Sequence, residues 1–401
     1  MFSKARVIAA LEAKREGFIG YELRAGQDLE RYEEALAWLS TRSQGQVFQQ
    51  LERAVRPGAL PTAERVAGRA VVHPFGHRWA NHQEARDWAL KALRGVTTLA
   101  VDGSQITPSP DFSIPVGAVQ VGWFENPHRA DGEYTKDIRF EVLPPQELAA
   151  EGEDMSRFPD LQVNLRRFEL ECEVLVEAMH RLTGRAPAPV CFFDGSLIIS
   201  FAARIRNPEL QFGYLRAVRS VLVASEQTRV PLVGYVDTSR ARDLVTLLCR
   251  LMEYDEPPGL SDGALLRRRM SWGDRTEAFT CARDDGLFEG DHEALDYYSR
   301  VHFLYLKTTA DNTPVRLDLP SWVLGAGGSE GEIELERVLD VVRAECVVGT
   351  GYPYAVETAD AVAVITNTDR ERFHRTFQEF VATLDAEMQY ARKAYSKRGR
   401  R

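Results

Sequence analysis

The spacing of apolar residues changes along the chain, and the change predicts where helices give way to strands. From residue 1 to about residue 92, apolar residues recur at helical spacing, as in Arg31–Leu39 and Glu84–Leu90. Short apolar runs then predict strands at Thr98–Val101, Val116–Trp123 and Arg139–Val142. The pattern therefore predicts a helical N-terminal region followed by a meander of antiparallel strands.

After the meander, helices and buried strands alternate. Predicted helices cover about Leu161–Leu182, Arg216–Ser225, Ala241–Met252 and Ala355–Val364. Buried strands are expected at Val190–Phe193 and Val230–Val236, and a late strand pair at His302–Thr308 and Pro314–Leu319. This order predicts an α/β fold with a mixed central sheet flanked by helices, a helical N-terminal region and helical insertions.

Two of the predicted strands end in the same phrase. Asp102-Gly103-Ser104 follows one apolar run, and Asp194-Gly195-Ser196 follows another. Each phrase places a carboxylate at the mouth of a buried strand, where open α/β sheets collect ligands. Two neighbouring buried carboxylates repel each other unless a proton or a cation lies between them, so Asp102 and Asp194 are candidate ligands of a divalent metal. The alternative is that Asp-Gly-Ser is only a turn that ends each strand.

The helix expected over about Leu161–Leu182 supplies a third acid. At about 100° per residue, Glu171 lies on the flank of the apolar stripe formed by Cys172, Leu175, Met179 and Leu182. The other glutamates of this helix face away from the stripe: Glu169, Glu173 and Glu177. Glu171 is therefore the third candidate ligand, and the alternative is that it pairs with Arg167, four positions earlier.

These phrases resemble the NurA nuclease family. That family has one aspartate in a Val-Asp-Gly-Ser phrase and a second in an Asp-Gly-Ser phrase after a long helix, which match Asp102 and Asp194. The segment Gly351-Tyr352-Pro353-Tyr354, followed by a predicted helix, is similar to the Gly-Tyr-Pro segment near the family's C-terminus. The likeness runs from about Leu99 to about Ile365 and is to a bacterial-type member of the family.

The resemblance implies an RNase H-like fold and a manganese-dependent deoxyribonuclease, with two ions in the site and magnesium as the alternative ion. It also implies exonuclease and endonuclease activity on single-stranded DNA and duplex ends, in the processing of double-strand breaks. A HerA-type hexameric ATPase is the implied partner, and a homodimer the implied assembly. Carboxylates suit such hard ions, and two ions stabilise the charge that develops in phosphodiester cleavage, so no histidine base is required.

A fourth ligand is expected in the helix after Gly-Tyr-Pro. The family has a histidine there, whereas this chain aligns Asp360, which is itself a good oxygen ligand. Asp360 is therefore the fourth candidate ligand, and the alternative is a solvent-facing or capping aspartate. Tyr352 also matches the family, and it is expected either to orient a phosphate or a ligand through its hydroxyl or to pack in the core.

The formal net charge of −9 means that any contact with DNA must be a local basic surface. The candidate DNA-binding residues are Arg204, Arg240, Arg267, Arg268 and Arg269, and Trp272 and Arg275 lie just beyond as a stacking surface and further charge. The alternative for the arginine run is a solvated loop. The basic tail from Arg392 to Arg401 is suited to DNA or to an acidic partner.

The cysteines and the lengths of the apolar runs indicate the compartment in which the protein is expected to occur. The five cysteines are widely spaced, without a Cys-x-x-Cys motif, which argues against a zinc knuckle or a disulfide framework and predicts buried thiols. No run of eighteen or more apolar residues occurs, and the start of the chain leads into charged helical sequence. We therefore expect a cytoplasmic protein without a membrane segment.

We expect three segments: a helical N-terminal region over residues 1–92, a nuclease domain over 93–375, and a C-terminal helix with a basic tail over 376–401. The expected function is metal-dependent cleavage of DNA. Two other functions stay open: a nucleotide-binding phosphotransferase or ATPase of the actin-like superfold, in which Asp-Gly-Ser turns hold nucleotide phosphates, and a noncatalytic DNA clamp or loader of a translocase. ATP binding would favour the first, and metal-independent DNA binding without cleavage would favour the second.

Overall fold

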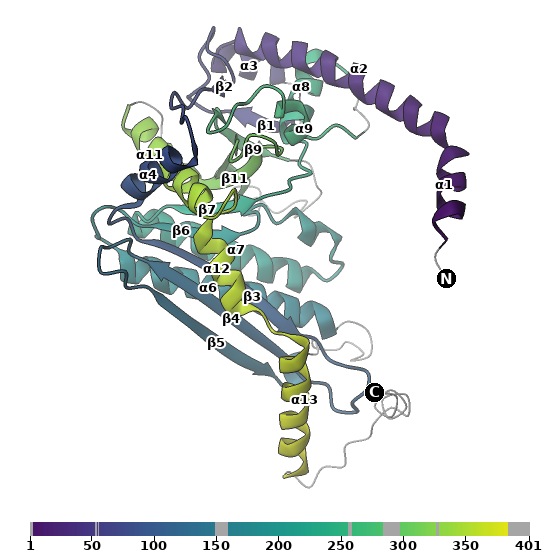
Figure 1. Cartoon of the computed structure of the whole chain (residues 1–401), viewed down its shortest axis with the longest axis vertical. Coiled ribbons are helices and arrows are strands. Elements are labelled where there is room, and N and C mark those ends of the chain that lie inside the picture. Colours follow the sequence, from purple (N-terminus) through teal and green to yellow (C-terminus); the bar gives the residue numbers. More distant parts are fainter. Residues whose placement is uncertain are drawn as a thin grey trace.

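A mixed sheet forms the centre of the molecule (Figure 1). The structure, a computed structural model, describes residues 3–52, 54, 56–148, 159–255, 259–283, 297–325 and 329–383. Strands β3 (Thr98–Ile106), β4 (Gly117–Asn126) and β5 (Thr135–Leu143) form an antiparallel meander. Strand β6 (Val190–Asp194) pairs in parallel with β3, and β7 (Leu232–Val236) pairs in parallel with β6. The resulting order β5-β4-β3-β6-β7 is that of an RNase H-like sheet, so the predicted fold class is confirmed.

Helices cover both faces of this sheet. Helices α6 (Pro159–Leu182) and α7 (Pro208–Thr228) pack against each other on one face. Helices α4 (His82–Leu93), α11 (Ser329–Val348) and α12 (Tyr354–Ala363) cover the other face (Figure 1). Strand β6 is apolar throughout because alternate residues enter the two cores, Cys191 and Phe193 on the α6 side and Val190 and Phe192 on the α12 side.

The second half of the sheet is an antiparallel extension beside β7. It consists of β1 (Gly58–Pro61), β9 (Phe279–Ala282), β10 (Val301–Leu306) and β11 (Val315–Pro320), with the short strands β2 (Val72–His73) and β8 (Arg275–Thr276) next to β10. Strands β10 and β11 are the late pair that the sequence predicts. Strands β1 and β2 lie in the region expected to be helical. They are strands because β1 pairs with β9 and β2 pairs with β8, each about two hundred residues away in the sequence. The local spacing of apolar residues cannot predict pairing over such a distance.

The remaining helices lie at the ends and the upper side of the molecule (Figure 1). Helix α2 (Arg15–Ser40) buries only its C-terminal half, through Tyr32, Ala35, Leu36 and Leu39, and α1 (Lys4–Glu12) buries nothing. Helices α3 (Gln44–Leu51), α8 (Asp243–Met252) and α9 (Asp262–Leu266) pack together near β1. The short elements are α5 (Pro145–Leu148), η1 (Ser200–Arg204) and η2 (Ser321–Val323).

Helix α13 (Asn367–Ala382) begins at a capping box on Thr366 and runs across residue 375. The division into residues 1–92, 93–375 and 376–401 stays a prediction, and the basic tail from Arg392 to Arg401 lies outside the described residues. All five cysteines are buried free thiols, as predicted. Among the described helices, none combines the length and the apolar character needed to cross a membrane.

Candidate metal centre

The parallel pairing of β3 and β6 places the two predicted aspartates side by side. Val101 is opposite Phe193, so Asp102 and Asp194 follow on neighbouring strands. Strand β6 ends at Asp194, where Gly195 turns the chain with a φ of +135°, a conformation that favours glycine. Strand β3 does not end at Asp102, contrary to the sequence prediction. It continues to Ile106 because β4 pairs with it along its whole length.

Two glycines allow helices to approach Asp102 closely. A Cβ on Gly103 would overlap the Glu171 carboxylate and lie 2.9 Å from Cγ of Arg167, so α6 can pack there only on a glycine. Gly122, which is opposite Asp102 on β4, touches α12: a Cβ there would lie 2.7 Å from the backbone nitrogen of Ala363. These close approaches bring Glu171 from one face and Asp360 from the other toward Asp102 in β3.

Glu171 lies where the helical periodicity predicts it. It is 4% exposed, and its Oε1 accepts a hydrogen bond from Arg167 Nη1 at 2.5 Å. Glu171 therefore faces inward and is paired with Arg167, and its role as a metal ligand stays a prediction. The glutamates predicted to face away bind surface arginines: Glu169 and Glu173 lie 3.5 and 2.6 Å from Arg166, and Glu177 lies 2.7 Å from Arg139.

The acids of this cluster disfavour one another's ionised form. Burial, together with the neighbouring Asp194 and Asp360 carboxyls, raises the pKa of Asp102 to about 6. Burial raises the pKa of Glu171 to about 7, although Arg167 opposes the shift. Burial also raises the pKa of Asp194, and the charges of Asp360 and Asp237 add to it. A site of this kind gains a proton or a cation readily.

Tyr352 binds Asp194 from the loop before α12. Its hydroxyl donates a hydrogen bond to Oδ1 of Asp194 at 2.9 Å, and its ring packs edge-on against Tyr235 at 5.0 Å. Burial and the Asp194 charge raise the pKa of Tyr352, so the hydroxyl stays a proton donor. Tyr352 therefore packs through its ring and binds a candidate metal ligand through its hydroxyl, and its role in orienting a phosphate or a ligand stays a prediction.

The chemistry of the donor set fits a hard divalent cation, because every candidate ligand is a carboxylate. The described part of the chain contains no group of three or more His, Cys, Asp or Glu side chains arranged to hold a metal ion as they stand. Asp194 and Asp360 are exposed, Asp102 is half-buried, and Glu171 is held by Arg167. The four candidate ligands gather at one edge of the sheet but are not in coordinating positions.

Only some of the residues predicted to bind DNA are exposed and not engaged in an ion pair with another side chain among the described residues. Arg204, Arg240, Arg267 and Arg268 are exposed, whereas Arg269 forms an ion pair with Glu33 at 2.9 Å. Trp272 is half-buried and packs on Trp79, with ring centroids 4.8 Å apart. Arg275 is 2% exposed and binds Glu64 and Glu336 at 2.7 and 2.6 Å. The expectation that Arg275 adds charge for DNA is therefore wrong, because its guanidinium is buried in an ion-pair network.

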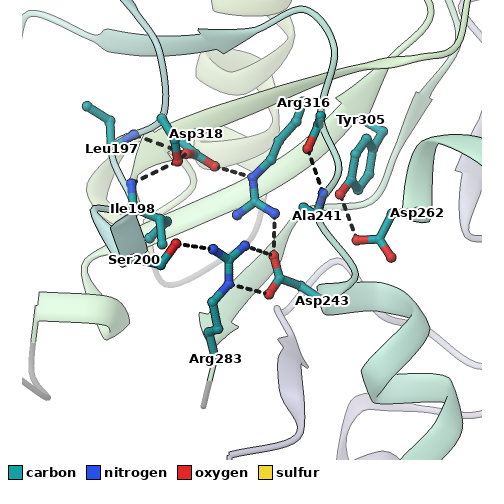
Figure 2. Close-up of polar contacts among 12 residues, drawn as sticks. Leu197, Ile198, Ser200, Ala241, Asp243, Asp262, Arg283, Tyr305, Arg316 and Asp318 are labelled. Carbon is teal, nitrogen blue, oxygen red and sulfur yellow. Dashed lines mark hydrogen bonds and ion pairs between the residues drawn. The ribbon is translucent and has the colours of Figure 1, made fainter. Parts of the chain in front are cut away.

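Sequence reasoning missed the residues that hold the loop after Asp194. Ser196 Oγ donates to Asp318 Oδ2 at 2.5 Å, and Asp318 belongs to a buried network that also includes Arg316, Asp243 and Arg283 (Figure 2). Ser196 and Asp318 are 122 positions apart, so no local pattern links them. Gly122 was also missed, although a glycine inside an apolar strand is a signal of close backbone approach.

An RNase H-like sheet with Asp102 within β3 and Asp194 at the end of β6 defines the class of protein, an α/β fold with a candidate metal centre on its central strands. The family model of the NurA domain matches residues 96–365, more than half of the chain, so the chain belongs to the NurA domain family. This membership supports a nuclease. No curated protein matches the chain.

Solved structures similar to the chain include two of NurA. The crystal structure of NurA is 10% identical, with 71% of this chain and 89% of that chain covered and a TM-score of 0.38. The crystal structure of NurA with manganese is 9% identical, with 72% and 91% covered and a TM-score of 0.34. The catalytic domain of human endonuclease V is 14% identical, with 82% and 95% covered and a TM-score of 0.30.

Proposed function

We propose that the chain is a metal-dependent deoxyribonuclease that hydrolyses phosphodiester bonds at the acid cluster of β3 and β6. The observation that carries the proposal is the placement of Asp102 and Asp194 on adjacent parallel strands, with the Asp360 carboxyl beside them. The raised pKa values of Asp102 and Asp194 support it. Burial is the main cause of both shifts and neighbouring carboxylates add to it, and a bound divalent cation favours the charged form of each acid.

In this proposal, Asp102, Glu171, Asp194 and Asp360 hold manganese or magnesium, with two ions in the working site. When bound, such ions stabilise the charge on the phosphate oxygens and lower the pKa of the attacking water. Carboxylates are suited to these ions, whereas zinc favours nitrogen and sulfur ligands. Arg167 occupies only Oε1 of Glu171, so the second carboxylate oxygen would serve as the ligand atom while Arg167 Nη1 also donates to the Gly103 carbonyl at 3.4 Å.

Tyr352 acts in the same proposal as an orienting residue. Its hydroxyl donates to Oδ1 of Asp194 and so restricts rotation of the carboxyl group. Oδ2 of Asp194 is then held in a fixed direction for a metal ion. Because the pKa of Tyr352 is raised, the hydroxyl keeps its proton and does not compete as an anionic ligand. We assign it no proton transfer.

The proposed substrate is DNA, taken as single strands and as duplex ends, with exonuclease and endonuclease action. The exposed arginines Arg204, Arg240, Arg267 and Arg268 are the proposed backbone contacts, and Arg269 joins them only if it leaves Glu33. A chain of net charge −9 holds long duplexes poorly, so we propose that a HerA-type hexameric ATPase delivers the strands during double-strand break processing. A cytoplasmic location and a homodimer complete the proposal.

The test is cleavage of end-labelled single-stranded and double-stranded DNA by the full chain with manganese, magnesium or EDTA. We expect cleavage with manganese, less or equal cleavage with magnesium, and none with EDTA. ATP hydrolysis without DNA cleavage would instead identify a phosphotransferase or ATPase of the actin-like superfold. DNA binding that persists in EDTA, without cleavage in any metal, would identify a noncatalytic clamp or loader.

A further inference from the structure

The loop that follows Asp194 is attached to a fully buried carboxylate on β11. The backbone nitrogen of Leu197 donates to Oδ2 of Asp318 at 3.1 Å (Figure 2). Ser196 Oγ donates to the same oxygen at 2.5 Å. Ser196 Oγ also accepts a hydrogen bond from the backbone nitrogen of Ile198 at 3.0 Å. The serine hydroxyl therefore closes the turn with its lone pair and ties the turn to Asp318 with its only proton.

The Asp318 carboxyl is held toward this loop because an ion pair with Arg316 fixes its other oxygen, Oδ1. Arg316 Nε donates to Oδ1 of Asp318 at 2.7 Å, and Arg316 Nη1 donates to Asp243 Oδ2 at 2.5 Å. Arg283 binds both oxygens of Asp243, at 2.6 and 2.8 Å, and also Ser200 Oγ at 2.7 Å (Figure 2). Asp318 is 0% exposed, so loss of the Ser196 hydroxyl removes one hydrogen-bond partner of a buried charge, while Arg316 and the Leu197 amide remain.

Two further contacts hold the same loop, one from Tyr297 and one at Gly195, where the loop starts. Tyr297 accepts a hydrogen bond from the backbone nitrogen of Ile199 at 3.0 Å and donates one to the carbonyl of Leu197. Gly195 donates to the carbonyl of Tyr235 on β7 at 3.0 Å. The chain from Asp194 onward is therefore fixed by contacts from β7, from β11 and from Tyr297.

The two Asp-Gly-Ser phrases thus differ in what the serine does. Ser104 continues the ladder between β3 and β4, opposite Gln120, so the sheet itself fixes Asp102. Asp194 is the last residue of its strand, and the sheet fixes it from one side only. Its carboxyl is held by Tyr352, and its backbone is held by the loop that Ser196 attaches to Asp318.

We propose that Ser196 and Asp318 are positioning residues of the metal centre: they fix the loop that carries Asp194 and thereby set the affinity of the acid cluster for a divalent cation. This inference rests on the proposed function. It also gives a role to the antiparallel extension of the sheet, since β11 carries Asp318 and Arg316 to the edge where the acids gather.

The test is Mn²⁺ binding to the full chain, measured by isothermal titration calorimetry, together with cleavage rates over a range of Mn²⁺ concentrations. Ser196→Ala should raise the Mn²⁺ dissociation constant about tenfold, the lower end of the range for groups that orient metal ligands. At saturating Mn²⁺ its cleavage rate should approach that of the wild type. Ser196→Thr, which keeps the hydroxyl, should restore most of the affinity.

Tyr305→Phe is the matched control. It removes the hydrogen bond from Tyr305 to Asp262, 2.7 Å long, in a neighbouring buried carboxylate site (Figure 2). Among the described residues, the hydrogen bonds of Tyr305 and Asp262 do not reach the loop after Asp194. It should leave the Mn²⁺ dissociation constant within about twofold of the wild type, even if it lowers the melting temperature as much as Ser196→Ala does. Asp318→Asn should also raise the Mn²⁺ dissociation constant. If Asp318→Asn does not fold, the Ser196 variants alone test whether the loop sets the Mn²⁺ affinity.

Hydrogen exchange gives a readout that needs no metal, because the Leu197 and Ile198 amides should exchange faster in Ser196→Ala. Wild-type Mn²⁺ affinity in folded Ser196→Ala would overturn the inference and leave the proposed function intact. A wild-type chain that neither binds Mn²⁺ nor cleaves DNA would overturn the proposed function instead.

Discussion

At the scale of single residues, Asp360 is the position where the resemblance expects a histidine and this chain has a carboxylate. It is exposed on α12, and its charge contributes to the raised pKa of both Asp102 and Asp194. Asp360 is therefore a proposed metal ligand, and the alternative is an ordinary surface residue of α12.

We predict that Asp360→Ala raises the Mn²⁺ concentration needed for half-maximal cleavage. Asp360→Asn should behave like alanine, because the affinity of the site depends on negative charge, and Asp360→His should recover part of the activity, because imidazole also binds manganese. Glu357→Gln, an exposed change on the same helix, is the control and should be silent. A surface role would leave all three Asp360 variants with an unchanged Mn²⁺ dependence and with stability changes under about 0.5 kcal/mol.

The acid cluster also makes the stability of the metal-free protein depend on pH. Asp102 and Glu171 have higher pKa values in the folded chain than in the unfolded chain, so the folded state holds more protons between about pH 4 and pH 7. The free energy of unfolding should therefore fall as the pH rises through this interval. In EDTA, Asp102→Asn should remove on the order of 1–2 kcal/mol of that fall. Urea unfolding at pH 5 and pH 7.5 measures it, and identical pH dependence in wild type and variant would contradict the prediction.

At the scale of elements, the sequence predicts the acid-bearing strands well and their surroundings less well. The helical phase of Glu171 follows from one continuous apolar stripe, and the strand positions follow from runs buried on both faces. Strands β1 and β2 depend on partners about two hundred residues away. The pairing of Ser196 with Asp318 is equally remote in sequence, so neither could be predicted from local spacing.

Gly122 tests how closely α12 must approach the sheet. Gly122→Ala places a methyl group about 2.7 Å from a backbone nitrogen of α12, which cannot move without shifting the helix. We predict a loss of roughly 1–3 kcal/mol of stability, typical of overpacking, and a higher Mn²⁺ requirement because Asp360 moves with α12. Gly45→Ala is the control, since nothing lies within 4 Å of the added methyl. Thermal unfolding and Mn²⁺ titration of both variants measure the effect, and a silent Gly122→Ala would show that α12 is not constrained there.

At the scale of the whole molecule, a chain with a net charge of −9 is expected to depend on a partner that feeds it DNA. We predict that a HerA-type ATPase binds the full chain and increases the rate of cleavage at duplex ends. Deletion of residues 392–401 tests whether the basic tail serves that contact. A titration that shows neither binding nor a change in rate would remove this partner from the account.

The most direct test of the central claim is the rate at which Asp102→Asn and Asp194→Asn cleave end-labelled DNA at saturating manganese, with Asp137→Asn on β5 as an exposed control. Both cluster variants should fold, because each removes a charge from a crowded acid site, and their rates should fall at least about 100-fold. Asp137→Asn should cleave at the wild-type rate. Near-wild-type cleavage by either folded cluster variant would contradict the assignment of the nuclease site to the acid cluster of β3 and β6.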